Sequence, residues 1–360
     1  MILGHLFLQN FRSYSKSEFT FSENTTVIIG PNTSGKSNLI EAIFLLSTGK
    51  SFKTQKDTDM IMFEKQVGRA SASTNPDSIG TNNEINLEVV ISSGEFEGRQ
   101  PSKKFLVNKV PKRRVDFAGN LVTVLFSPLD LEIISGSPGI RREFLDNVLE
   151  QTDRDYRLAG ISYAKALRQR NALLELVRQT GKYQEKQFEY WDNLLIQNGQ
   201  IITKKREACI RFLNNETKEV FDCALLYDKS IISHDRLEQY KKAEEGAGVT
   251  LVGPHRDDFT VCLYNNSRQT THEVKTFGSR GQQRLVVLQL KLLQLLFVEK
   301  SLEQPPLFLL DDIFSELDEE HIIHVLNLLG KQQTILTTTH EEFIPQKIKK
   351  QMSVIELIKE

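Results

Sequence analysis

Alternation of apolar and polar residues predicts short β-strands toward both ends of this 360-residue chain. Leu6 and Leu8 lie two residues apart, Phe19 and Phe21 stand between polar neighbours, and residues 26–29 form a run that leads into a glycine-rich turn. A period of two residues is typical of half-buried strands. Similar patterns predict further strands at residues 84–91, 105–110, 121–126, 259–263 and 333–338.

The middle of the chain has a helical pattern instead. Residues 140–245 contain few Gly or Pro and are rich in Arg, Lys, Glu, Gln and Leu. Residues 153–180 and 184–221 are expected to form two long helices that reach roughly 40–55 Å at about 1.5 Å per residue. That length makes an arm, but it is too short for an extended coiled-coil rod. A strongly apolar helix is expected later, at residues 282–299.

This change of pattern predicts two lobes. We expect residues 1–125 and 246–360 to form an α/β lobe, lobe I, and residues 126–245 to form a helical lobe, lobe II, inserted into it. A chain of this length is long enough to build two cores.

Composition narrows the function classes. Net charge is −1, so any DNA binding has to come from local basic patches. No apolar stretch approaches the ~18 residues that a membrane span needs, and the first residues lack the features of a signal peptide. The three cysteines, Cys209, Cys223 and Cys262, form no C-x-x-C, so neither a disulfide framework nor a zinc site is indicated. We therefore expect a cytoplasmic protein.

A phosphate-binding loop is predicted directly after the strand at residues 26–29. Apolar residues at helical spacing follow it, which gives the strand–loop–helix context of G-x-x-x-x-G-K-[ST]. Its backbone amides and the helix N-terminus should hold ATP phosphates. Lys36 should reach the β- and γ-phosphates and Ser37 should ligate Mg²⁺. The motif comprises Gly30, Pro31, Asn32, Thr33, Ser34, Gly35, Lys36 and Ser37.

The acidic half of the same site lies near the other end of the chain. Residues 307–312 are an apolar run that ends in Asp311 and Asp312. Asp311 suits a second Mg²⁺ ligand, held directly or through water, and Asp312 suits a group that polarises the attacking water. Either acid could instead cap the following turn. Because the two halves are so far apart, the sequence predicts an ATPase core opened to admit another module.

Three further segments have the residue types of a shared nucleotide site. Residues 279–283 resemble the signature loop of ABC-type ATPases, in which a Ser hydroxyl and a Gly amide bind the γ-phosphate held by another subunit. The segment with Ser315 and Asp318 suits a loop that contacts a partner subunit. His340 suits a histidine that senses the γ-phosphate. The residues concerned are Ser279, Gly281 and Gln282, then Ser315 and Asp318, then His340.

Taken together, these motifs resemble the ABC-type heads of the SMC and Rad50 group. Residues 51–54, 128–146, 253–258 and 310–318 are similar to characteristic segments of RecF, a family of bacterial recombination mediators, and the resemblance spans the chain. Leu129 stands where that family usually has an acid, and Lys53 where it usually has Arg. The resemblance implies an α/β fold: an ABC-type P-loop ATPase head (lobe I) with an inserted short helical arm (lobe II).

The resemblance also implies a function. Such proteins form dimers on ATP, bind gapped DNA or single-/double-strand junctions, and help RecR to load RecA. They are slow ATPases whose hydrolysis resets the dimer, and we expect DNA to stimulate it. Residues 10–12 resemble the N-terminal loop of Rad50-like heads, where the Arg approaches phosphate, although Arg12 could equally be a surface residue on a hairpin.

Basic residues between 99 and 114 are the first candidates for contact with DNA, because cations on a hairpin can neutralise phosphates. Smaller clusters lie at residues 165–170 and 204–206, and any of the three could simply be a solvated face. The candidates are Lys103, Lys104, Lys109, Lys112, Arg113 and Arg114.

Two other functions remain open. A transporter ATPase subunit or an SMC-like assembly would use the same nucleotide motifs, but the helical insertion is long for a transporter subunit. A nucleotide kinase would leave the signature-like loop and His340 without a role. Gln55 and Gln66 are both possible Q-loop glutamines, and the sequence does not decide between them. It also gives no DNA polarity, RecR contact surface or turnover rate.

Overall fold

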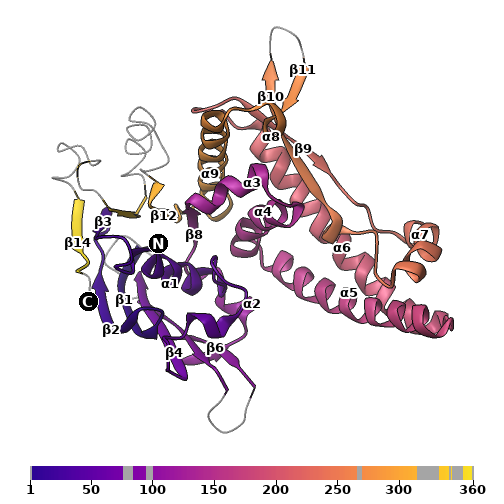
Figure 1. The fold of residues 1–360 in the computed structure, drawn as a ribbon, viewed down its shortest axis with the longest axis horizontal. Helices are drawn as coiled ribbons and strands as arrows, with labels where there is room; N and C mark the ends of the chain where they lie inside the picture. The colour runs from indigo at the N-terminus through magenta and orange to yellow at the C-terminus, as the bar shows by residue number, and fades with distance from the viewer. Residues whose placement is uncertain are drawn as a thin grey trace. The chain divides into compact units, whose positions relative to one another are not determined.

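The computed structural model describes residues 2–75, 84–94, 100–265, 270–313, 332–339, 342 and 352–358. The chain divides into two compact units, one made of Met1–Asp130 and Gln294–Glu360 and the other of Leu131–Leu293. Figure 1 shows their strands and helices. The α/β class expected from the sequence is confirmed.

An antiparallel sheet forms one side of the first unit, in the order β2-β1-β4-β5-β6-β7. In β5, Leu87, Val89 and Ile91 are buried and alternate with less buried neighbours, as expected for a sheet with one face toward a core. The strands are β1 (Ile2–Phe11), β2 (Tyr14–Thr20), β4 (Val67–Asn75), β5 (Ile85–Ser92), β6 (Ser102–Val107) and β7 (Val110–Lys112).

A parallel sheet in the same unit brings the two ends of the chain together. Its order is β14-β3-β13-β12-β8, so the strand before the glycine-rich turn pairs on both sides with late strands. Every residue of β8, β12 and β13 is buried, which explains their unbroken apolar runs. The strands are β3 (Thr25–Ile29), β8 (Thr123–Phe126), β12 (Leu307–Asp311), β13 (Thr334–Thr338) and β14 (Met352–Glu356).

Helix α1 (Lys36–Thr48) contacts strands of both sheets. Eleven of its thirteen residues are buried, so the helix is apolar on nearly all sides and lies in the core. Gly49, at φ 73°, ends it in the left-handed conformation. The described part of the first unit also contains three short turns: η1 (Asp57–Met60), α2 (Arg114–Phe117) and the start of η3 (Pro128–Leu131).

The second unit contains the two long helices predicted from the sequence, α5 (Arg154–Thr180) and α6 (Glu185–Asn215). The Asp153 side chain caps α5 by accepting from the Tyr156 amide, and Gly181 ends it at φ 68°. The other described helices are α3 (Glu132–Ser135), α4 (Pro138–Thr152), α7 (His234–Ala247), η4 (Pro254–Arg256) and α8 (Val274–Phe277). Helix α9 (Arg280–Leu302) begins in the second unit, and its residues from Gln294 onward belong to the first.

A small antiparallel sheet also belongs to the second unit, with the order β11-β10-β9. Its strands are β9 (Cys223–Asp228), β10 (Asp258–Asn265) and β11 (Thr270–Glu273). Because β9 packs on α6 and β10 on α4, the second unit extends to Leu293, whereas the sequence pattern predicts a return to lobe I at residue 246. The first boundary falls after Asp130 instead of after residue 125.

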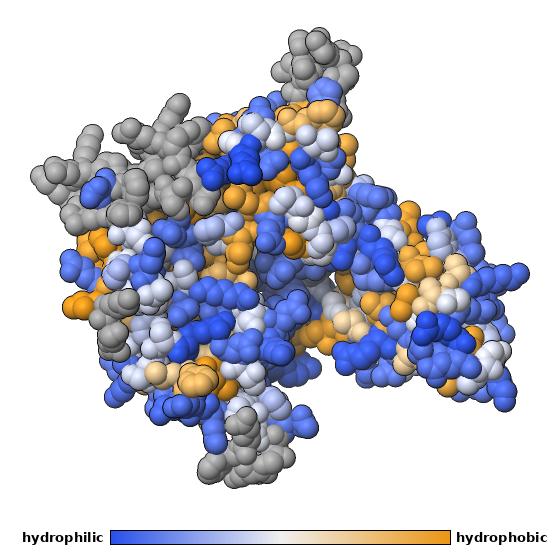
Figure 2. Space-filling model, viewed as in Figure 1, coloured by the Kyte–Doolittle hydropathy of each residue, from blue (hydrophilic) through white to orange (hydrophobic). Residues whose placement is uncertain are grey.

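Polar residues predominate on the face of the molecule drawn in Figure 2. Exposed apolar residues of the helical unit, such as Ile161, Leu176 and Tyr190, are spread over different turns of α5 and α6. Within the described residues, no helix is both long and apolar enough to cross a bilayer.

Candidate nucleotide site

A tight loop connects β3 to α1 in the first unit. Gly35 lies at φ 95°, and a Cβ there would be 2.8 Å from the Tyr14 hydroxyl oxygen. At Gly30 a Cβ would be 2.9 Å from the carbonyl oxygen of Leu357. Both positions therefore need glycine, because a side chain has neither the space nor, at Gly35, the backbone conformation. The loop leads directly into the N-terminus of α1, and helix N-termini favour the binding of phosphate.

Lys36 folds back over the loop that precedes it. Its Nζ donates to the carbonyl oxygens of Gly30, at 2.6 Å, and Pro31, at 2.9 Å. Burial lowers the pKa of Lys36, while the nearby carboxylates of Asp312 and Asp311 oppose that shift. The ammonium is thus fixed beside the loop, where a phosphate would compensate its charge.

The hydroxyl groups of Ser37 and Thr337 both contact the same carboxylate oxygen of Asp311. The Ser37 hydroxyl donates to Asp311 Oδ1 at 2.9 Å, and the Thr337 hydroxyl donates to the same oxygen at 2.8 Å. Pairing of β12 with β13 places Asp311 opposite Thr337. The structure therefore brings together Lys36, Ser37 and Asp311 from opposite ends of the chain.

This donor set fits Mg²⁺. A serine hydroxyl and a carboxylate are hard oxygen ligands, and Mg²⁺ usually adds waters and substrate phosphates to one or two such groups. Among the described residues no three His, Cys, Asp or Glu side chains gather into a metal cage. Ser37 and Asp311 are thus the two residues that could hold Mg²⁺ together with phosphate oxygens.

Asp312 follows β12 in the left-handed conformation, at φ 52°. Aspartate tolerates this region better than most residues. Its amide donates to the Thr337 hydroxyl at 3.0 Å, so Thr337 supports both acids at once. Thr337 was given no separate role in the sequence, where a threonine in a buried strand is ordinary. The strand pairing alone reveals it.

Arg12 lies in the turn between β1 and β2 and binds a buried carboxylate. Its Nε and Nη2 donate to the two oxygens of Glu41, at 2.9 and 2.7 Å, and its Nη1 donates to the Asp59 carbonyl. Glu41 is fully buried on α1. Arg12 thus has a structural partner close to the loop, and its contact with phosphate stays a prediction.

A cavity of about 910 Å³ adjoins this turn. Arg12, Asn38 and Phe63 line it, and so does Gln66, one of the two glutamines considered for the Q-loop. Gln55 is not among the lining residues.

The signature-like loop begins α9. Ser279 and Gln282 cap this helix reciprocally: the Ser279 amide donates to Gln282 Oε1 at 2.9 Å, and the Gln282 amide donates to Ser279 Oγ at 3.2 Å. This is a capping box, which satisfies two amides at the helix start. Ser279 and Gly281 are exposed. Ser315, Asp318 and His340 lie outside the described residues.

The basic hairpin β6–β7 is only partly available for DNA. Its turn residues Asn108 and Lys109 are both at positive φ, as in a tight hairpin turn. Lys103 pairs with Asp57, Arg113 pairs with Asp116, and Arg114 donates to the Thr48 carbonyl. Three lysines are exposed and have no ion pair among the described residues: Lys104, Lys109 and Lys112.

The clusters on the helical arm include two buried arginines. Arg170 is 3% exposed and pairs with Asp192 and Glu244, and Arg206 is 5% exposed and pairs with Asp146 and Asp257. Because they are buried in ion-pair networks inside the helical unit, these two arginines are not available for contact with DNA. The prediction that these clusters contact DNA was therefore wrong for Arg170 and Arg206.

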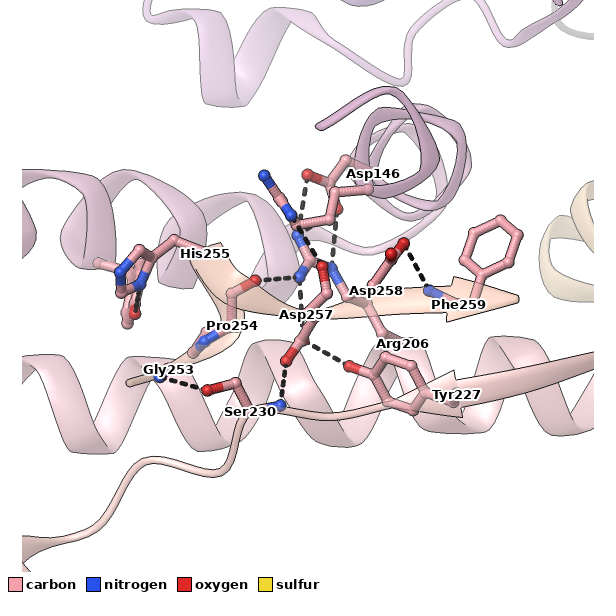
Figure 3. A network of polar contacts seen from close by, with 12 residues as sticks. Asp146, Arg206, Tyr227, Ser230, Gly253, Pro254, His255, Asp257, Asp258 and Phe259 are labelled. Carbon is pink, nitrogen blue, oxygen red and sulfur yellow. Dashed lines mark hydrogen bonds and ion pairs between the residues drawn. The ribbon is translucent and has the colours of Figure 1, made fainter. Parts of the chain in front are cut away.

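The network around Arg206 incorporates the Gly253–Asp258 segment (Figure 3). Arg206 Nη1 donates to the Pro254 carbonyl at 2.7 Å, and Asp257 accepts from the Tyr227 hydroxyl. His255 lies between the Tyr163 hydroxyl, at 2.7 Å, and the Thr250 carbonyl, at 3.1 Å. Burial lowers the pKa of His255 to about 4. The Gly253–Asp258 segment is therefore part of the polar network inside the helical unit.

Comparisons with known proteins agree in sequence and structure. The family model described as RecF/RecN/SMC N terminal domain matches residues 2–358. The chain is 34% identical to the DNA replication and repair protein RecF of Crocosphaera subtropica, over 94% of this chain and 93% of that protein. It is 31% identical to the protein of the same name from Bacillus cereus, over 99% of this chain and 96% of that protein.

Solved structures give the same picture. The recombination mediator protein RecF with ATP, described in the RecFOR pathway, superposes with a TM-score of 0.84 and 28% identity, over 95% of this chain and 93% of that one. An Smc head bound to the C-winged helix domain of ScpA shares the fold, with a TM-score of 0.52 and 15% identity, over 95% of this chain and 91% of that one.

Proposed function

The chain belongs to the RecF family, and on that premise we propose that it is an ATP-dependent DNA-binding recombination mediator of the RecFOR pathway. One observation carries the nucleotide part of the proposal. Ser37 follows the glycine-rich loop, and its hydroxyl bonds to Asp311, at the end of a strand from the far end of the sequence. An ATP site needs these two groups together.

The residues divide the work of ATP hydrolysis. Lys36 and the amides at the start of α1 would bind the β- and γ-phosphates. Ser37 and Asp311 would hold Mg²⁺, which would neutralise charge on the phosphates. Asp312 accepts the proton of the attacking water, and Thr337 keeps both acids in place. We propose a slow hydrolysis that DNA accelerates.

A nucleotide-dependent homodimer is the second part of the proposal. Ser279 and Gly281 of one copy would bind the γ-phosphate held by the other, and Ser315, Asp318 and His340 would contribute to the same shared site. The capping box supports this role, because it fixes the start of α9 before any ligand arrives. Hydrolysis removes the bridging phosphate and so releases the dimer.

DNA is the proposed partner of the dimer, at gaps or single-/double-strand junctions, with RecR and indirectly RecA. Lys104, Lys109 and Lys112 are the first contacts to consider, since they are exposed on the β6–β7 hairpin. Lysines that meet phosphates release counterions, so binding should weaken steeply as salt rises.

Light scattering tests the whole proposal. With Mg²⁺ and ATP the protein should double in mass, with ADP it should remain monomeric, and a gapped duplex should join only the ATP form. A Lys36→Met variant is the control that cannot bind nucleotide. An ATP-driven dimer with no affinity for DNA would instead indicate a different ABC-type assembly.

A further inference from the structure

Two phenylalanine side chains lie on the surface of the protein. Phe63 is 88% exposed and Phe277 is 67% exposed, and among the described residues no other phenylalanine is exposed. A single exposed apolar residue is ordinary in a soluble protein. These two are informative because each lies beside one half of the proposed ATP site.

A tight turn holds Phe63 in place. The Lys65 amide donates to the Met62 carbonyl at 3.0 Å, and Glu64 lies at φ 62°, in the turn position that favours glycine. The Met62 amide also donates to the Asn10 carbonyl at 2.9 Å, which ties this turn to the one between β1 and β2. Phe63 is therefore displayed to solvent from a fixed backbone.

This turn lies beside the phosphate-binding half of the site. Phe63 and Asn38 line the same cavity of about 910 Å³, and Asn38 directly follows Ser37 in the sequence. Phe63 is thus a large apolar group at the rim of that cavity.

Phe277 lies at the other half of the site, at the end of α8 and just before the signature-like loop. The Gly278 amide donates to the Val274 carbonyl at 2.9 Å. The Gln283 side chain, from α9, donates to the carbonyls of Val274, at 3.4 Å, and Gly278, at 3.3 Å. The Phe277 ring contacts the His272 ring, with 5.2 Å between centroids, and most of its surface faces solvent. This segment is therefore fastened to α9 with an aromatic side chain directed outward.

We propose that in the ATP-bound dimer Phe277 of each copy packs against Phe63 of the other. The inference rests on the homodimer proposed above, in which Ser279 meets the γ-phosphate held by the partner copy. Phe277 precedes Ser279 by two residues, a span of at most about 7 Å, so it would meet the partner's surface around that phosphate. Phe63 supplies an exposed aromatic group on this surface. Two-fold symmetry makes the contact twice, and aromatic side chains are enriched in the buried centres of interfaces.

Cross-linking tests the contact directly. The natural cysteines Cys209, Cys223 and Cys262 are all buried, so new surface thiols can be labelled selectively. A mixture of Phe63→Cys and Phe277→Cys, treated with a short bis-maleimide, should give a covalent dimer with ATP and Mg²⁺ but not with ADP. Each variant alone is the control, because symmetry places its new thiol opposite an unchanged phenylalanine. An ATP-driven dimer of the mixture, seen by light scattering, that yields no cross-link would overturn the inference.

Truncation measures how much the contact contributes. Phe277→Ala and Phe63→Ala should each weaken ATP-driven dimerisation about tenfold or more in sedimentation, as expected for a buried aromatic at an interface. The double variant should lose little more than either single one, since both remove the same contact. Tyr190→Ala, which truncates an exposed aromatic on α6, is the matched control and should dimerise normally.

ATP affinity of the monomer and thermal melting should be unchanged in all these variants. Fully additive losses in the double variant, or weaker ATP binding by monomeric Phe63→Ala, would contradict the proposed contact, because each phenylalanine would then act on something else. Failure of the unchanged protein to dimerise on ATP is a separate result, which refutes the homodimer itself.

Discussion

Asp311 Oδ1 receives a hydrogen bond from Ser37 on one side and from Thr337 on the other. A carboxylate held in this way presents its remaining lone pairs in a fixed direction, which a cation with strict octahedral geometry requires. In the proposed mechanism the residues therefore have two kinds of role: some would bind phosphate or Mg²⁺, and Thr337 would orient them.

Thr337→Val tests the orienting threonine. Loss of the hydroxyl removes one donor from Asp311 and the acceptor of the Asp312 amide, so we expect the Mg²⁺ concentration for half-maximal hydrolysis to rise about tenfold. ATP binding without Mg²⁺ should change little. Thr337→Ser is the matched control, because it keeps the hydroxyl. If the Val variant has an unchanged Mg²⁺ requirement, Thr337 has only a packing role.

Substitution of Lys36 and substitution of Asp312 should impair different steps, nucleotide binding and hydrolysis respectively. Lys36→Met should abolish nucleotide binding, because it removes the positive point charge that attracts the phosphates. Asp312→Asn should retain ATP binding and slow hydrolysis by about 100-fold, the effect expected when a general base is lost. Equilibrium binding and single-turnover hydrolysis check this division. An Asn variant that binds no ATP would show that both acids serve binding.

Several of these residues were readable in the sequence, and others were not. The glycine-rich loop is contiguous, so its chemistry is local. Thr337 acquires its role only when β13 pairs with β12, which no local pattern reveals. Arg170 and Arg206 were misread as surface charges, although a signal existed: each lies four residues after an apolar residue on the buried helix face, Ala166 and Ile202.

At the scale of elements, helices were easier to predict than sheets. Both long helices follow from composition and periodicity, whereas the capping box formed by Ser279 and Gln282 was not predicted and was found in the structure. The order of the parallel sheet was not predicted either, because strands distant in sequence pair through burial on both faces. The second unit ends after Leu293, later than predicted, because the strand predicted at residues 259–263 is part of β10, which pairs with β9 and β11 and not with the sheets of the first unit.

The Gly253–Asp258 element should make the helical unit sensitive to acid. His255 has a folded pKa of about 4 against an ordinary value of 6.5, so the unfolded chain takes up this proton at a higher pH. The contribution of neutral His255 to the stability of the folded state is therefore complete above pH 6.5 and is lost as the pH falls toward 4. We expect His255→Gln to reduce the stability lost between pH 7 and pH 4 by about 2–3 kcal/mol.

The single tryptophan provides the measurement. Trp191 lies in α6, so its fluorescence during urea unfolding reports on the helical unit. His234→Gln, at the exposed start of α7, is the matched control and should keep the full pH dependence. Identical pH dependence in both variants would show that His255 is not the group responsible.

At the scale of the whole molecule, Ser279 tests the dimer. Ser279→Asp keeps an oxygen that can cap α9 but places a negative charge where the partner's γ-phosphate would bind. We expect this variant to bind ATP normally as a monomer, to form no ATP-induced dimer, and to lose DNA affinity in parallel. Ser279→Asn, a neutral cap, is the control for helix integrity. A dimer of the Asp variant in sedimentation with ATP and Mg²⁺ would remove the signature-like loop from the mechanism.

The position of β3 in the parallel sheet has a consequence for the nascent protein. Both of its neighbours, β13 and β14, come from residues 334–356, so β3 emerges from the ribosome long before either partner exists. Contacts that close such long loops form slowly and leave apolar strand edges exposed in the meantime. We therefore expect the growing chain to lack nucleotide affinity, and to depend on chaperones, until its last strands have been made.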